Sequence, residues 1–579
     1  MRSVASNSAT ADAYAGTGRH RRRLAPDLVR IAGLVVVAVV VLAPIALIAY
    51  QSVLDGPFFM PKATWSLSSY AFVWTDPEFF QALRTTLLLA AGMVAISVPL
   101  GAILAFLIVR TDLPGRRWIE PLILAPIFIS AIVLAFGYVV AIGPVGFISL
   151  WFKSIFGFVP WNVYSLGTLI VIAGLSHAPH VYLYTASALK NLNPEVEEAA
   201  RTVGAGVWRV AFTVSLPLVM PAIVFSGTLI FLLGFEMFGL VLILGDQGGI
   251  VVLTTYLYKL TNLLGTPSYH LMAVVAIVIV LVTLPLVLLQ RRLLRGTARY
   301  ATVRGKGMAH RPLPLRKWRW PALALVMLWL TLTIFLPLAG LVLRSVVTSW
   351  GEGIGVLDAL TFSNFENLFQ YPNLVRSIVN TIVLAAIGGA LAVVVYTLVA
   401  LIAHRWQGKG PAVLDYVVIT PRAMPGLIAG LAFLWIFLFV PFLTSFRSTL
   451  ISLWVAYTVV WIAYGMRLIS STLMQVGPEL EEAGRVTGAG LGRVTCDITI
   501  PLIRYGLLGS WLLIFMTFTR EYSTGVYLLG PNTEVIGSMI VSLFGSGGLD
   551  LVAALSVINV LLTGLALVLA LKFGVRVHA

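Results

Sequence analysis

Five ionisable side chains interrupt long apolar stretches of this sequence and are its first candidates for chemistry: His177, Glu236, Arg422, Arg520 and Glu521. Such groups are costly in apolar surroundings unless they face a polar cavity or a partner. The segments FLLGFEMFGLVLILG and FMTFTREYSTGVYLLG align Glu236 with Glu521, so we expect the two carboxylates to face each other. Opposed carboxylates suit a cationic or metal-bearing solute. A structural ion pair with Arg520, or an anchor for an outer gating loop, explains them equally well.

The remaining candidates have several interpretations each. His177 and His180 are three residues apart, a spacing that can place both imidazoles on one helix face. Pro179 between them favours a kink, and we assign no certain metal site. Arg422, beside Pro421, would end a half-helix, bind a solute or extend its charge toward a lipid headgroup.

The composition places these residues in a membrane. Hydrophobic residues make up 59% of the 579 residues and charged residues only 11%, with a mean hydropathy of +0.96. A soluble protein needs more polar surface than this. About twelve apolar stretches reach the roughly 20 residues that a helix needs to cross a bilayer, and helices satisfy their own backbone hydrogen bonds there. The sequence therefore predicts an all-α polytopic membrane protein with about 12 transmembrane helices.

The net charge of +16 is distributed as a membrane topology requires. Lys and Arg gather in alternate connecting segments, most strongly in residues 291–319. This asymmetry predicts that those segments and both termini are cytoplasmic, so the basic charge indicates the lipid bilayer as partner and no nucleic acid. The single cysteine, Cys496, excludes an intrachain disulfide and a cysteine-based metal cluster.

Two polar segments of the chain repeat each other. PEVEEAARTVGAGVWRVAFTVSLP begins at Pro194, and PELEEAGRVTGAGLGRVTCDITIP begins at Pro478, 284 residues later. Asn193 suits a helix cap, proline suits the first helical position and glutamates suit the first turn. Gly204 and Gly488 suit the left-handed conformation that ends a helix. Each segment therefore predicts a short acidic surface helix, from Pro194 to Val203 in the first copy.

The repeat extends over most of the chain. ALRTTLLLA at 82–90 aligns with SIVNTIVLA at 377–385, and Pro126 aligns with Pro421. We predict two homologous six-helix halves in parallel orientation, residues 31–290 and 320–579, because an even number of spans restores the starting side. Residues 291–319 form a basic cytoplasmic linker. Residues 1–30, rich in Ser, Ala, Gly and Arg, are expected to form a disordered cytoplasmic tail.

The duplicated segments resemble the EAA loop, pattern E-A-A-x3-G-x9-I-x-L-P, of the permease subunits of binding-protein-dependent ABC importers. Val214, Gly484 and Ile500 depart from the pattern, and a glycine inside a helix costs about 1 kcal/mol relative to alanine. The resemblance implies two MetI-like transmembrane domains. It also implies that one fused chain supplies both domains of an importer in the bacterial cytoplasmic (inner) membrane.

The same resemblance implies partners. In such permeases the short helix docks into a groove of a cytoplasmic ATPase, and its movement couples nucleotide-driven closure to alternating access. The positions that match this docking motif are Glu198, Ala199, Gly204, Glu482, Ala483 and Gly488. Two loops imply two ABC ATPase subunits, and an extracytoplasmic solute-binding protein is expected to select the solute. The simpler alternative is that Glu198 and Glu482 only solubilise a surface helix.

No catalysis is expected from the chain itself. It contains no G-x-x-x-x-G-K-[ST] segment to hold nucleotide phosphates, and the glycine-rich GEGIG at 351–355 lacks the lysine. We therefore expect a non-catalytic transmembrane subunit without a cofactor of its own. ATP and Mg²⁺ are expected on the separate ATPase chains.

The substrate is suggested by local similarity. FEMFG followed by GGIVVLTTYLYKL, and REYSTGVYLLGPNTEVI, look most similar to segments of iron(III) importer permeases, so ferric iron is the expected substrate. Thiamine, aminoalkylphosphonate and polyamine are alternatives within the same class. An ion-driven secondary transporter is the alternative of another class, and it would leave the paired acidic loops without a task. A structural scaffold would also leave the polar span residues unexplained.

Overall fold

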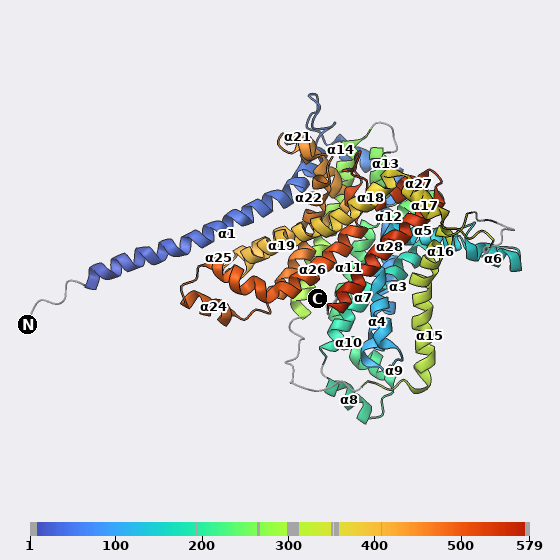
Figure 1. The fold of residues 1–579 in the computed structure, drawn as a ribbon, viewed down its shortest axis with the longest axis horizontal. Coiled ribbons are helices and arrows are strands. Elements are labelled where there is room, and N and C mark those ends of the chain that lie inside the picture. Colours follow the sequence, from blue (N-terminus) through green and yellow to red (C-terminus); the bar gives the residue numbers. More distant parts are fainter. Residues whose placement is uncertain are drawn as a thin grey trace, which may run out of the picture.

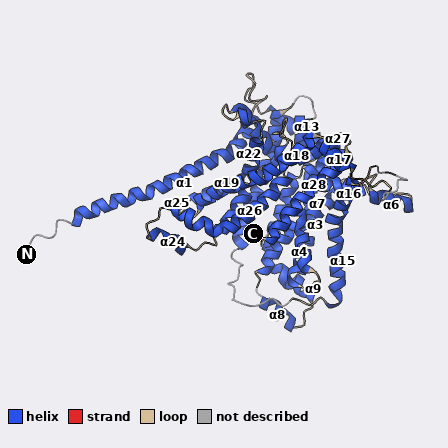
Figure 2. Ribbon diagram, viewed as in Figure 1, coloured by secondary structure: helices blue, strands red, loops and turns tan. Residues whose placement is uncertain are grey.

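The computed structural model describes residues 8–192, 194–262, 267–297, 312–348, 351, 358–406 and 408–573. Within these ranges every regular element is a helix (Figure 2), and β-type pairing is limited to isolated bridges such as Leu54 with Trp65. The all-α prediction is therefore confirmed.

The first half ends with the long helix that precedes the basic linker. Its elements are α1 (Ser8–Ser52), α2 (Ser68–Val73), α3 (Pro77–Arg110), α4 (Arg116–Leu124), η1 (Ala125–Ile127), α5 (Ala131–Ile142), α6 (Phe147–Phe156), α7 (Leu166–Lys190), α8 (Pro194–Thr202), α9 (Val207–Val210), η2 (Ala211–Ser215), α10 (Leu216–Leu218), α11 (Met220–Glu236), α12 (Gly239–Leu244), η3 (Asp246–Gly248), α13 (Leu253–Asn262) and α14 (Tyr269–Thr297).

The second half repeats this order with small differences. Its elements are η5 (Arg316–Trp318), α15 (Arg319–Leu330), η6 (Thr331–Phe335), α16 (Leu336–Ser345), α17 (Ser363–Gln370), α18 (Pro372–Val383), η7 (Leu384–Gly388), α19 (Gly389–Ala403), α20 (Gly410–Ile419), η8 (Thr420–Ala423), α21 (Gly426–Phe439), η9 (Thr444–Phe446), α22 (Leu450–Val460), α23 (Ile462–Leu473), α24 (Pro478–Val486), α25 (Leu491–Val494), η10 (Thr495–Thr499), α26 (Ile500–Arg520), η11 (Ser523–Gly525), α27 (Ile536–Gly545) and α28 (Leu549–Lys572).

The predicted number of spans agrees with the structure. In the part of the chain that is described, nine helical stretches are long and apolar enough to cross a membrane. Three further pairs qualify as single spans that are sharply bent, by 73° before α11, by 104° between η8 and α21 and by 63° between α22 and α23. Counting each pair as one span gives twelve.

Prolines explain where two equivalent spans break. Pro421 lies in η8 and Pro425 directly precedes α21, and a proline in a helix interior removes a backbone hydrogen bond and crowds the preceding turn. The first half has Pro126 in the equivalent η1, followed by a break at residues 128–130. The apolar stretch at 119–142, one of the twelve that we expect to be single spans, is therefore two helices, α4 and α5.

The first span of each half packs on the opposite half. α1 contacts α19, α20 and α21. In return, the Trp329 indole donates to the Leu175 carbonyl of α7 (3.2 Å), and the Tyr138 hydroxyl of α5 donates to the Leu332 carbonyl of η6 (2.8 Å). The first span of each half thus contacts the other half, and buried residues of both halves form the largest apolar core.

The expectation of a disordered N-terminal tail is wrong for residues 8–30. They form the start of α1, which projects from the body of the molecule toward the N-terminus (Figure 1). A helix already formed by the first span gains one hydrogen bond for each added residue, and the Arg, Leu and Ala of residues 21–25 have high helix propensity. Residues 298–311 of the predicted linker lie outside the described residues, as does Asn193.

Candidate functional site

A cavity of about 260 Å³ lies between the two halves. Its walls come from the ends of α11 and α26, from the breaks before α5 and α21, and from α7 and α23. All five ionisable residues that the sequence singled out line it: His177, Glu236, Arg422, Arg520 and Glu521. Residues from separate spans thus converge on one chamber at the interface of the repeats.

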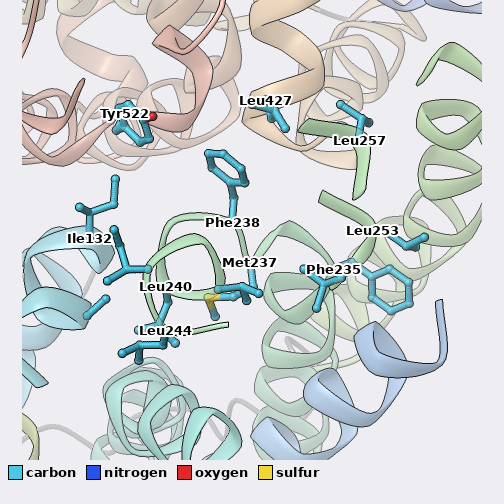
Figure 3. Packing of buried hydrophobic residues seen from close by; sticks show 14 of the residues in the cluster. Ile132, Phe235, Met237, Phe238, Leu240, Leu244, Leu253, Leu257, Leu427 and Tyr522 are labelled. Carbon is cyan, nitrogen blue, oxygen red and sulfur yellow. The ribbon is translucent and has the colours of Figure 1, made fainter. Parts of the chain in front are cut away.

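Aromatic packing closes one side of this chamber. Phe238 of the first half stacks on Tyr522 of the second, with ring centroids 6.3 Å apart and an interplanar angle of 15°. Figure 3 shows the Phe238 ring pointing toward Tyr522 and Leu427 from the turn that carries Met237. The chamber is therefore bounded by apolar contacts across the two halves as well as by charged groups.

The Glu521 carboxylate is fully engaged by its own half. It accepts hydrogen bonds from the Trp461 indole (2.9 Å) and from the Ser523 hydroxyl (3.0 Å). The backbone N–H of Thr524 (3.1 Å) and its hydroxyl (3.0 Å) donate to the same carboxylate. These donors tie Glu521 to η11, the turn that follows α26, so its geometry fits the expected loop anchor.

Arg520 links the two halves and does not pair with Glu521. Its guanidinium donates to the Ile127 carbonyl of the first half, and it lies over the Trp461 ring at 5.7 Å from the centroid. The Ser130 hydroxyl donates to the Arg520 carbonyl at 3.4 Å. Among the described residues no ion pair between Arg520 and Glu521 occurs, which disfavours the ion-pair interpretation.

Glu236 is held differently from Glu521 although the two positions are equivalent. Within the described part of the chain its carboxylate makes no hydrogen bond or ion pair, and Arg422 and Glu521 line the same cavity. The reason lies in the next turn. The donors Ser523 and Thr524 are replaced at the equivalent positions by Phe238 and Gly239, whose side chains have no donor. Glu236 therefore presents a carboxylate to the cavity.

The imidazole of His177 is oriented by its own helix. Its Nδ1 lies 2.8 Å from the Ala173 carbonyl, so this nitrogen carries the proton and Nε2 is left as an acceptor. The ring stacks on that of His180 at 5.5 Å, while His180 itself does not line the cavity. In the described ranges no group of three or more His, Cys, Asp or Glu side chains is placed to hold a metal ion.

The second candidate site consists of the two short helices α8 and α24. They end at Thr202 and Val486, and the glycines that follow, Gly204 and Gly488, have φ of +85° and +88°. Only glycine adopts this conformation at little cost. The motif residues Glu198, Ala199, Glu482, Ala483 and both glycines are exposed, so the two helices expose the same motif positions.

A buried ion pair, which the sequence did not reveal, holds α8 to the end of α3. Arg110 Nε lies 3.0 Å from Glu197 Oε1, and their side chains are only 3% and 7% exposed. The N–H is not aimed at that oxygen, so this contact is an ion pair and not a hydrogen bond. The Ser215 hydroxyl donates to the same carboxylate (2.7 Å), and Arg110 Nη2 donates to the Leu192 carbonyl.

The second half repeats this network residue for residue. Arg405 Nε lies 3.3 Å from Glu481 Oε2 and its Nη2 donates to the Val476 carbonyl, while Thr499 donates to Glu481 Oε1. These positions equal those of the first network plus 295 for the arginine and 284 for the others, the same offsets that align the two halves. The shared spacing is the signal that would have found both networks from sequence.

The second network differs by one added residue. His404 Nε2 lies 2.8 Å from Glu481 Oε1, whereas the equivalent residue in the first half is Val109. Burial raises the pKa of the Glu481 carboxyl, but the contacts from His404 and Arg405 outweigh it and hold that pKa below its usual value. Glu481 is thus ionised and held by two basic side chains.

A π-helical turn follows each short helix, η2 in the first half and η10 in the second. Ser215 and Thr499, which donate to the buried glutamates, are the last residues of these turns. Such wide turns are frequent at functional sites. Each short helix is thereby bonded both to the end of an earlier span, α3 or α19, and to the π-helical turn that leads into the following span.

The departure from the loop pattern at Gly484 has a packing explanation. Gly484 is buried, and a Cβ built on it would lie 2.6 Å from Ile498 Cδ1. The first half has Ala200 and the smaller Val214 at the equivalent positions, in one apolar cluster. The glycine therefore makes room for the larger isoleucine, which offsets its low helix propensity.

Comparison with known proteins agrees with this duplicated architecture. The family described as "Binding-protein-dependent transport system inner membrane component" matches residues 97–299 and again residues 403–577. A ferric transport system permease protein of Actinobacillus pleuropneumoniae is 23% identical over 84% of this chain and 69% of its own length. A provisionally named ferric transport system permease of Haemophilus influenzae is 23% identical over 83% and 74%. A molybdenum transport system permease protein of Escherichia coli is 34% identical over 28% of this chain and 71% of its own length.

Proposed function

This chain belongs to the family of binding-protein-dependent transport system inner membrane components, and we propose that α8 and α24 couple it to two cytoplasmic ABC ATPase subunits. The chain is a multi-pass permease of an ABC importer in which one polypeptide carries both transmembrane domains. The observation that carries the coupling proposal is the pairing of two identical exposed motif faces, each held to its half by an ion pair between an arginine and a buried glutamate.

In this proposal, the ion pair and the hydrogen bond that hold each short helix transmit its movement to the spans. A partner that moves α8 pulls on Glu197, which is bound to Arg110 at the end of α3 and to Ser215 at the start of the next span. α24 acts in the same way through Arg405 and Thr499. The movement of either short helix reaches the central cavity, because the spans that follow α8 and α24 end at Glu236 and Arg520. Opening and closing of the cavity is thus linked to the partner.

Ferric iron is the proposed substrate. Two ferric permeases align over most of this chain, and the Glu236 carboxylate that faces the cavity is a ligand type suited to a hard cation. The solute is delivered by a separate solute-binding protein on the opposite side of the membrane. Both termini then lie in the cytoplasm, and the membrane is the bacterial inner membrane.

Co-purification with the ATPase tests the coupling. Glu198→Ala with Glu482→Ala is expected to weaken retention of the ATPase, while the permease still inserts and purifies. The matched control is Glu195→Ala with Glu479→Ala, which removes the same charge from the first turns of the same helices. Equal retention in the motif variant and the unmodified permease would refute docking at these faces. Equal loss in both variants would reduce the effect to surface charge.

A further inference from the structure

A second cavity, of about 380 Å³, lies beside α24 and opens next to α1 and α19. Its polar wall contains Arg30, His404, Arg405, Glu481 and Arg485, and its apolar wall includes Leu398 and Ile402. Three arginines and one histidine line it together with a single carboxylate, Glu481, which is itself bound by His404 and Arg405. The cavity therefore has an excess of positive charge beside apolar side chains.

At the equivalent place in the described part of the first half, the chain's own side chains fill the space. The positions equivalent to Leu401, Ile402, Val494 and Thr495 of the second half are occupied there by Phe106, Leu107, Val210 and Ala211. They are buried in one cluster with Leu313 and Leu315, which precede α15.

That filling segment is bonded in place. The Leu313 N–H donates to the Arg110 carbonyl (2.8 Å), and the Leu315 N–H donates to Asp112 Oδ1 (2.8 Å). On the second half the neighbour of α19 is α1, which is one continuous helix from Ser8 to Ser52 (Figure 1). The described chain ahead of the first span, from Ser8, therefore does not turn back to cover the wall that Leu313 and Leu315 cover in the first half.

The surroundings of the cavity identify its occupant. On α19, Leu391, Val394 and Leu398 are each about half exposed and share one helix face, inside a membrane span. Leu398 also lines the cavity, so this apolar face leads along the membrane directly to the arginines. A molecule with an anionic head and apolar tails matches both parts, because basic pockets between spans bind anionic headgroups.

We propose that this cavity is a binding site for an anionic phospholipid. The headgroup phosphate lies among Arg30, Arg405 and Arg485, and the acyl chains lie along the exposed face of α19. Because Arg405 and Arg485 belong to the network and to the helix of the second coupling loop, the lipid joins α1, α19 and α24. Among the described residues, the equivalent place in the first half is filled by Leu313, Leu315 and their neighbours, so the two loops respond differently to the lipid around them.

Native mass spectrometry of the full-length permease in neutral detergent tests the site without ATPase or transport, so its outcome is separate from that of the proposed function. The probes are dihexanoyl-phosphatidylglycerol, dihexanoyl-phosphatidylcholine and inorganic phosphate. Arg30→Ala with Arg485→Ala is expected to bind the phosphatidylglycerol about 30-fold more weakly, from the contribution of each basic residue near an anionic headgroup. The matched control, Arg201→Ala with Arg209→Ala, removes the same charge beside the filled site and is expected to bind like the unmodified chain.

Leu398→Trp provides a variant that keeps every charge and blocks the apolar entrance, and it too is expected to bind the lipid weakly. Equal phosphatidylglycerol binding by the Arg30/Arg485 variant and its control would overturn the proposal. So would equally tight binding of phosphatidylcholine. Full displacement of the lipid by inorganic phosphate would assign the site to a free anion instead.

Discussion

The two arginine–glutamate pairs differ in burial and predict a measurable difference between equivalent mutations. Arg110→Ala leaves the Glu197 carboxylate, whose side chain is 7% exposed, with the Ser215 hydroxyl as its remaining partner. Removing one member of a buried pair costs about 3–5 kcal/mol. Arg405→Ala removes a side chain that is 37% exposed, and Glu481 keeps His404 and Thr499. Its expected cost is only about 1 kcal/mol.

Thermal unfolding of the purified variants in one detergent measures this difference. Arg110→Ala is expected to lower the midpoint several times more than Arg405→Ala. Arg110→Met combined with Glu197→Leu should recover most of the loss, because no charge is then left buried without a partner. Equal midpoints for the two arginine variants, or no recovery in the double variant, would refute the claim that the buried ion pair between Arg110 and Glu197 holds α8 to α3.

Three further predictions follow from the same contacts. Gly484→Ala is expected to destabilise the permease because the new methyl meets Ile498, and Ile498→Val should turn the same change into a stabilisation of up to about 1 kcal/mol; unfolding midpoints of the two variants check this. Glu236→Gln is expected to lower solute uptake with little loss of stability. Glu521→Gln should lower the free energy of unfolding by about 1–3 kcal/mol, because four hydrogen bonds are donated to the Glu521 carboxylate. Similar stability of both variants would contradict the different roles of the two carboxylates. The folded-state pKa of Glu481 lies below its unfolded value, so its contribution to stability is present above the ordinary glutamate pKa of about 4.3 and is lost as pH falls through the lower folded value; Glu481→Gln should flatten that part of the stability profile.

Sequence patterns with a local cause were sufficient for the spans and the short helices. Prolines and glycines act on their own turns, which is why the ends of α8 and α24 and the break at Pro421 follow from single residues. The break at residues 128–130 was missed, because an apolar stretch does not reveal that its helix stops and starts again. The sequence did not predict the helix at residues 8–30, because their composition alone does not favour a helix. The adjoining first span is already helical and serves as the nucleus from which that helix extends.

The candidate site could be predicted only in part, because its roles depend on distant partners. Alignment made Glu236 and Glu521 equivalent, yet the donors Ser523 and Thr524 exist on one side only, and Phe238 and Gly239 replace them on the other. That difference was readable from the sequence two and three residues further on. The ion pair between Arg110 and Glu197 could not be predicted from either residue alone. It required the paired offsets of both halves.

Uptake of radioactive ferric iron into proteoliposomes tests the central claim most directly. The vesicles contain this permease with its ATPase, the solute-binding protein is added outside, and ATP is enclosed with the ATPase. The account predicts iron uptake that requires ATP and that falls in the Glu198→Ala, Glu482→Ala variant. Uptake that continues without ATP would contradict it and would identify an ion-driven transporter. Uptake of molybdate, thiamine, aminoalkylphosphonate or polyamine in place of iron would keep the coupling and refute the substrate.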